Sequence, residues 1–263
     1  MIQDKAINTL RFLGVDAIEK ANSGHPGIVL GAAPIIYTLF KDFVRIDPRY
    51  PSWYNRDRFI LSAGHGSALL YAMNHLAGYD ISLEDIKNFR TFGHTPGHPE
   101  YDIKRGIETT SGPLGQGVSN AVGMALAAKY IQARFNKEDV TLFDQYIYTL
   151  VGDGDLQEGV ALEALSLAGH LKLSNLVLLF DSNDIQLDGE VKYTFSEDTK
   201  TKIEALGFYY IKVLDGMDPD AIKKAIKKGQ RQQDKPIFIE VKTQIGFGSD
   251  VAGTSSAHGK PLF

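Results

Sequence analysis

The stretch that decides the fold is 145-QYIYTLVGDGDLQEGVALEALSLAGHLKLSNLVLLFDSN-183. It begins and ends with apolar runs, at 145–152 and 175–183, and between them residues 156–171 carry apolar side chains at helical spacing. A strand, a crossover helix and a second strand predict a βαβ unit with parallel strands. Because both apolar runs are continuous, we expect both faces of the sheet to be covered.

The same alternation extends on both sides of this unit. Further apolar runs predict strands at 58–67, with 59–61 as the buried part, and at 208–216 and 236–244. Apolar periodicity and helix-start residues predict helices at 3–21, 28–44, 67–78, 82–90, 117–135, 197–207 and 218–230. The pattern indicates an α/β fold, a parallel sheet with helices on both faces. No internal stretch is typical of a linker, so residues 1–263 are expected to form a single domain.

Composition narrows the class of protein. The 263 residues carry a formal net charge of −4, which gives no indication of a general nucleic-acid surface. The absence of cysteine excludes disulfides, thiolate metal sites and cysteine nucleophiles. The charged N-terminal stretch lacks the apolar core of a signal peptide, and no apolar run approaches the ~18 residues of a membrane span. We expect a cytoplasmic protein without nucleic-acid or membrane partners.

Polar residues follow the two strands of the opening stretch. Asp153 and Gly154 come directly after the first strand, and Asn183 follows the second. Because ligands bind outside the carboxyl ends of parallel strands, these residues would meet there if the strands are neighbours. A carboxylate and an amide oxygen suit Mg²⁺ or Ca²⁺. The backbone N–H of Gly154, at the start of the next helix, could receive a diphosphate. The arrangement predicts a metal-bridged diphosphate.

A less specific interpretation stays open from these residues alone. Gly-Asp-Gly after a strand is also typical of a tight turn, and asparagine after a strand is typical of an Asx turn. Asp155 and Glu158 are explained equally well as charges near the start of a helix, where the helix dipole favours carboxylates.

Histidines supply a second signal. Five of the seven follow glycine, at positions 25, 65, 94, 98 and 170. Glycine allows sharp turns close to a ligand, and imidazole can move protons near neutral pH. His75 and His170 lie at helix positions and are interpreted as structural. A zinc pair of His94 and His98 is disfavoured, because no cysteine or carboxylate pattern supports it.

Seven motifs in order resemble the transketolase family, more specifically its N-terminal, diphosphate-binding domain. GDG…DxN is common to thiamine diphosphate enzymes, whereas the full series is much more specific. The motifs are 22-NSGHPG-27, 61-LSAGHGSALLY-71, 93-GHTPGHPE-100, 111-SGPLGQG-117, 152-GDGDLQEG-159, 181-DSNDIQLDG-189 and 253-GTSSAHG-259.

The resemblance implies roles for individual residues. The divalent metal, Mg²⁺ or alternatively Ca²⁺ or Mn²⁺, would be bound by Asp153, Asn183 and the backbone carbonyl of Ile185. Thiamine diphosphate would further contact His65, Gly112, Pro113, Leu114, Gly154 and His258. The catalytic residues around the substrate hydroxyls and the reacting carbon would be His25, His98 and His258. Glu158 matches a glutamate near a subunit interface, and Asp155 is given no catalytic role.

The resemblance also implies a function for the whole protein. It would be a transferase of the pentose phosphate pathway that moves a two-carbon ketol unit from a ketose phosphate to an aldose phosphate. The pyrimidine-binding and C-terminal domains of the family have no counterpart in the sequence, so this would be a natural subunit or a fragment of a longer chain. We expect it to need a separate chain carrying the pyrimidine-binding domain, in a homo- or hetero-oligomer, and to be inactive alone.

Other functions stay open at this stage. The alternatives are another thiamine diphosphate enzyme, of the dihydroxyacetone synthase or deoxyxylulose phosphate synthase type, and a non-catalytic diphosphate-binding module. The loops 93–100 and 112–117 favour the transketolase type over the deoxyxylulose phosphate synthase type. The intact histidines at 25, 65, 98 and 258 argue against a module that has lost its activity.

Overall fold

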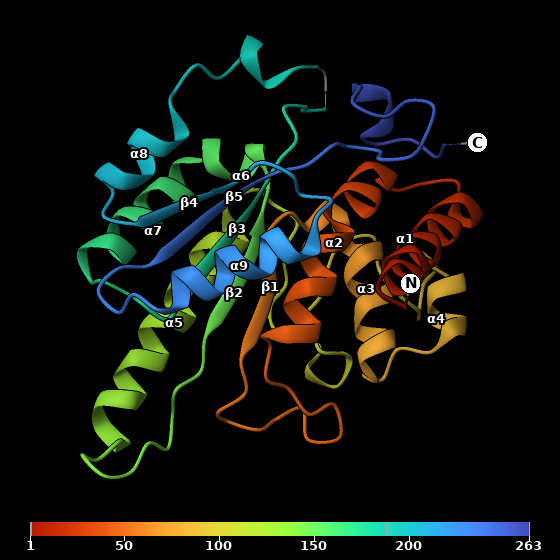
Figure 1. Cartoon of the computed structure of the whole chain (residues 1–263). Coiled ribbons are helices and arrows are strands. Elements are labelled where there is room, and N and C mark those ends of the chain that lie inside the picture. Colours follow the sequence, from red (N-terminus) through yellow and green to blue (C-terminus); the bar gives the residue numbers. More distant parts are fainter. Residues whose placement is uncertain (1, 188, 263) are drawn as a thin grey trace.

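Five parallel strands form the centre of the molecule, in the order β1-β2-β3-β5-β4 (Figure 1). The computed structural model describes residues 2–187 and 189–262, so residues 1, 188 and 263 of the predicted domain lie outside the described part. The strands are β1 (Arg58–Leu61), β2 (Ile147–Val151), β3 (Leu176–Ser182), β4 (Tyr209–Val213) and β5 (Ile237–Lys242). All the predicted strands are present, and β2 and β3 are neighbours, as the predicted βαβ unit requires.

Helices cover both faces of the sheet, which confirms the predicted fold class (Figure 1). On one face, α1, α2, α3 and α9 share a core with Leu150 and Leu179; on the other, α5, α7 and α8 share a core with Val151 and Phe180. Adjacent residues of one strand thus enter opposite cores, which explains the unbroken apolar runs. The helices are α1 (Ile2–Ala21), α2 (Pro26–Asp42), α3 (Ser67–Ala77), α4 (Leu83–Lys87), α5 (Gln116–Phe135), α6 (Asp153–Gln157), α7 (Gly159–His170), α8 (Thr199–Ala205) and α9 (Pro219–Gln230).

Local sequence explains where several helices begin. Asp218 accepts a hydrogen bond from the backbone N–H of Asp220 at 2.9 Å, and Pro219 occupies the first position of α9. At α4, the hydroxyl of Ser82 accepts from the N–H of Asp85 at 3.0 Å, and the Asp85 carboxylate accepts from the N–H of Ser82 at 2.9 Å. Both starts agree with the sequence-based predictions.

The helix predicted at 156–171 is divided into two helices. α6 begins earlier, at Asp153, and ends at Gln157, whereas α7 begins at Gly159. Glu158 between them has extended backbone angles, φ −76° and ψ 137°, which interrupt the helical hydrogen bonding. Its exposed side chain precedes α7, where the helix dipole favours a carboxylate. The sequence did not predict this break.

The carboxyl ends of the three consecutive strands lie at one edge of the sheet. Leu61 pairs in register with Leu150, and Val151 pairs with Phe180, so β1 and β2 end within one residue of each other and β3 continues to Ser182. The segments that follow them therefore emerge side by side. Among the described residues, no helix is both long and apolar enough to span a membrane.

Candidate functional site

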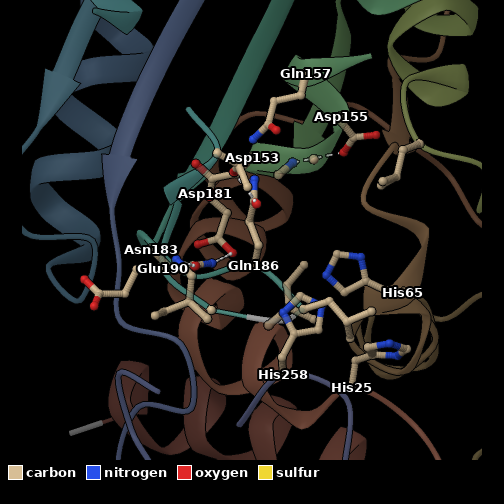
Figure 2. A pocket seen from close by; sticks show the side chains of 18 of the residues that line it. His25, His65, Asp153, Asp155, Gln157, Asp181, Asn183, Gln186, Glu190 and His258 are labelled. Carbon is tan, nitrogen blue, oxygen red and sulfur yellow. Dashed lines mark hydrogen bonds between the residues drawn. The ribbon is translucent and has the colours of Figure 1, made fainter. Parts of the chain in front are cut away.

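A cavity of about 500 Å³ lies at this carboxyl edge (Figure 2). The segments after β1, β2 and β3 contribute His65, residues 152–158 and much of 181–194 to its wall. The loop at 112–114 supplies another part, and His25 and His258 come from the two ends of the chain. The parallel order of the strands thus gathers segments from almost the whole sequence around one space.

The three residues predicted to bind a metal lie at this cavity. Asp153, Asn183 and Ile185 all line it, and their role as metal ligands stays a prediction. The side-chain Nδ2 of Asn183 donates to Asp181 Oδ2 at 3.0 Å, and its Oδ1 accepts from the backbone N–H of Ile185 at 3.0 Å. These two bonds fix the orientation of the amide, and Oδ1 keeps a second lone pair for a ligand.

The charge around Asp153 fits a divalent cation. Burial, together with the carboxylates of Asp181 and Asp184, raises the pKa of Asp153 to about 8, against the opposing effect of Lys242. A buried carboxylate with acidic neighbours lacks a compensating charge, which a cation would supply. Within residues 2–187 and 189–262, no group of three or more His, Cys, Asp or Glu side chains is placed to hold a metal ion. A cation here would therefore depend on the amide and carbonyl oxygens, an oxygen set that suits Mg²⁺ or Ca²⁺.

Three of the predicted histidines form a cluster in the wall of the cavity. The ring centroids of His25 and His65 are 5.2 Å apart, those of His65 and His258 5.3 Å, and those of His25 and His258 5.6 Å. Burial, and then the nearby groups that would repel a second positive charge, lowers the pKa of His25 to about 4 and that of His65 to about 3; these groups are the neighbouring histidines and, for His25, also Arg90. Burial also lowers the pKa of His258. The three imidazoles are therefore neutral near pH 7, and each ring has one N–H donor and one acceptor nitrogen.

Two atoms of this cluster lack a partner within the chain. Nδ1 of His25 and Nδ1 of His258 are buried, and neither makes a hydrogen bond to any described residue. Buried polar atoms are usually satisfied, so an unpartnered pair beside a cavity indicates a site for a polar ligand. Figure 2 shows both rings close to His65, on the opposite side of the cavity from Asp155.

His98 lies outside the main cavity. It lines a neighbouring space of about 720 Å³ together with Arg90, and it packs against Gly112, where an added Cβ would come within 3.2 Å of the His98 ring. Burial, followed by the charge of Arg90, lowers the pKa of His98. His94 instead contacts the carboxylate of Asp85 at 3.2 Å. A catalytic role for His98 stays a prediction.

The predicted loop at 112–114 is only partly in the wall. Gly112 and Leu114 line the main cavity, whereas Pro113 lines a separate surface hollow. Gly112 has φ +143°, in the region that favours glycine. Gly154 also lines the cavity as the second residue of α6, and an added Cβ there would come within 3.0 Å of the Leu114 side chain. The two loops are thus in close contact across one side of the cavity.

Asp155 lies in the first turn of α6, as its interpretation as a helix-start charge predicted, but its side chain is fully buried. It accepts hydrogen bonds from the hydroxyl of Ser62 at 2.8 Å, the N–H of Gly115 at 2.8 Å and the N–H of Gly152 at 3.0 Å. Two of these donors are far away in the sequence, so no local pattern could have indicated the contacts.

Known proteins that resemble the chain are transketolases. Residues 2–263 match the family model described as transketolase, thiamine diphosphate binding domain. The chain is 56% identical to the transketolase of Streptococcus pyogenes and 52% identical to that of Bacillus subtilis, over 99% of its own length in both cases. It covers 36% and 39% of those two proteins.

Solved structures give the same result. The R525L mutant of Pichia stipitis transketolase superposes with a TM-score of 0.98 at 47% identity, and the transketolase of Campylobacter jejuni with a TM-score of 0.94 at 48% identity. All of this chain is covered in both, but only 39% and 41% of the two larger chains. The chain spans about two fifths of the length of the relatives it matches.

Proposed function

Because the chain belongs to the transketolase family, through its thiamine diphosphate binding domain, we propose that the 500 Å³ cavity holds the diphosphate half of thiamine diphosphate. One observation carries this proposal. Asp153, Asn183, His25 and His258 all line a single space, and Nδ1 of each of the two histidines has no hydrogen-bond partner among the described residues. A bound cation would favour the ionised form of Asp153, whose pKa is raised by burial and acidic neighbours, and imidazole nitrogens can bind the polar groups of a polyanion.

The metal would be held by Asp153, Asn183 and the backbone carbonyl of Ile185. Mg²⁺ is the expected ion, with Ca²⁺ or Mn²⁺ as substitutes, since all three accept oxygen ligands. Gly154 and Gly112 offer backbone close to the cavity where a side chain would intrude on a neighbouring loop. The short helix α6 adds little dipole, so the N–H groups themselves would contact the diphosphate.

The histidines would bind polar groups and move protons. The cofactor supplies, when bound, the carbon nucleophile that takes up and releases the two-carbon unit. His65 would donate to the diphosphate side. His25 and His258, neutral near pH 7, would bind substrate hydroxyls and hold or return their protons. His98, in the adjacent space, would contact the substrate farther from the cofactor.

The whole reaction would need more protein than this chain. We propose that the two-carbon ketol transfer between sugar phosphates takes place only with a partner segment that carries the pyrimidine-binding domain. Exposed apolar residues near the cavity, among them Leu114, Leu187 and Tyr193, support a covering partner. A single domain, an oligomeric assembly, a cytoplasmic location and a place in the pentose phosphate pathway belong to the same proposal and follow from the family.

Calorimetric titration with thiamine diphosphate and Mg²⁺ tests the proposed function. We expect metal-dependent binding that strengthens when a chain carrying the second half of a transketolase is added, and negligible transketolase activity without that chain. Asp153→Ala should abolish metal-dependent binding. Asp234→Asn removes an exposed carboxylate just before β5, at the opposite edge of the sheet, and should retain metal-dependent binding. Equal binding by Asp153→Ala and wild type would show that the metal assignment is wrong.

A further inference from the structure

Asp155 joins segments that are distant in the sequence. Its Oδ1 accepts from Ser62 Oγ and from the N–H of Gly115, both at 2.8 Å, and its Oδ2 accepts from the N–H of Gly152 at 3.0 Å. Ser62 Oγ in turn accepts from the N–H of Val118 at 3.1 Å. One buried carboxylate therefore connects the end of β1, the start of α5 and the turn after β2.

The connected segments form the wall of the candidate cofactor cavity. Gly112 and Leu114 immediately precede Gly115, and Asp153 and Gly154 immediately follow Gly152. A Cβ added at Gly154 would come within 3.0 Å of the Leu114 side chain, so the two loops also lie close together beside these hydrogen bonds. Because the two oxygens of Asp155 bind donors on different loops, the spacing of the loops depends on both oxygens being acceptors.

From this geometry we propose that Asp155 is a positioning residue that holds the 112–115 loop against the 152–154 turn and so sets the shape of the cavity. It touches no reacting group; it acts through Gly115 and Gly152. The link to the cofactor rests on the proposed function, whereas the link between the loops rests on the hydrogen bonds alone.

Position 155 requires a carboxylate because hydrogen-bond donors face both of its side-chain oxygens. An asparagine of the same shape would keep one acceptor oxygen and place an N–H₂ group where the other oxygen was. In either orientation of the amide, that group would face a backbone N–H, of Gly115 or of Gly152. Asp155→Asn should therefore release one loop from the other without creating a cavity.

Amide hydrogen exchange of the whole chain, followed by mass spectrometry, tests whether Asp155 holds the 112–115 loop against the 152–154 turn. In Asp155→Asn we expect segments 112–118 and 152–158 to exchange at least about tenfold faster, the ratio expected when a hydrogen bond to a charged group is lost. The control is Ile222→Ala, which destabilises the core beneath α9, far from these loops. Unchanged exchange in both segments, or the uniform increase expected of the control, would overturn the proposal.

Ser62→Ala provides a second measurement if Asp155→Asn does not fold. It removes one donor to Asp155 and the acceptor for the N–H of Val118, so exchange should rise at 115–118 while the 152–154 turn keeps its protection. An unchanged exchange rate at 115–118 would contradict the proposed role of Asp155.

Cofactor affinity separates a positioning role from a purely structural one. With Mg²⁺ and the complementing chain present, Asp155→Asn should raise the dissociation constant for thiamine diphosphate by about tenfold, and Ile222→Ala should leave it unchanged. Equal constants for Asp155→Asn and wild type would refute the effect on the cavity. If wild type itself bound no cofactor, the proposed function would fail, and the exchange measurement would still decide whether Asp155 holds the loops.

Discussion

Replacing His65 by asparagine should remove a loss of stability that the wild-type chain suffers on acidification. Burial, and then the charges of His25, His258 and His98, lowers the pKa of His65 to about 3 in the folded state. In the unfolded chain the imidazole has its ordinary pKa of about 6.5. At pH values between these two pKa values, His65 is protonated in the unfolded state but not in the folded state. The contribution of His65 to stability is therefore full above pH 6.5 and is lost as the pH falls toward 3.

The magnitude follows from the width of that interval. At pH 5.0 the solution is about 1.5 pH units below the unfolded pKa, and each unit corresponds to about 1.36 kcal/mol, so His65 alone should reduce the free energy of unfolding by about 2 kcal/mol. At pH 7.5 the effect is about zero. Asparagine does not titrate, so the stability difference between wild type and His65→Asn should shift by this amount between the two pH values.

Urea unfolding of both proteins at pH 7.5 and pH 5.0, at equal ionic strength and without metal, measures this shift. His170→Asn controls for the removal of a histidine as such, because that side chain is exposed at the end of α7. If the free energy of unfolding differed between wild type and His65→Asn by the same amount at both pH values, the inference that burial keeps His65 neutral would be refuted. A shift of equal size in His170→Asn would refute it as well.

Three further substitutions have expected outcomes. Glu108→Gln breaks the buried ion pair with Arg56, in which both hydrogen bonds are 2.8 Å long. It should lower the free energy of unfolding by about 3–5 kcal/mol in urea titrations. A loss below about 1 kcal/mol, typical of exposed pairs, would contradict the burial. Gly169→Ala would place a methyl group 1.7 Å from the carbonyl oxygen of Leu206. It should destabilise the folded protein by about 1–3 kcal/mol or more, seen as a lower Tm in calorimetry. An unchanged Tm would contradict this close approach. Asp218→Ala removes the N-cap of α9 and should reduce stability by about 1 kcal/mol in urea titrations, and an equal midpoint would show that the cap contributes nothing.

The strands, and the meeting of Asp153 and Asn183 at one edge of the sheet, could be predicted because each depends on local pattern or on strand spacing. Apolar runs mark β2 and β3, and a crossover helix makes them parallel, which places Asp153 and Asn183 at one edge. The series of Gly-His motifs led to the family, and the comparisons with known transketolases confirm it. Roles of single residues in binding and catalysis stay predictions, and only the titrations described above test them.

The division of the predicted helix at Glu158 could not be predicted, because it depends on backbone angles that no residue type in 156–171 dictates. His98 and Pro113 line hollows next to the main cavity, and their roles in catalysis and cofactor binding stay predictions. Sequence periodicity does not encode how a loop folds back, so it could not place these two side chains.

The sequence by itself determined the α/β class, the family and the residues available for a metal and a diphosphate, because periodicity, strand ends and motif order are local properties of the chain. Only the tertiary structure decided how His25, His65 and His258 share one wall, and that the side chain of Asp155, at the start of α6, is buried. Its donors Ser62 and Gly115 reach it from other elements of the fold. A carboxylate can be stable in such a place only when its hydrogen-bond donors surround it, and those donors come together only after the sheet has formed.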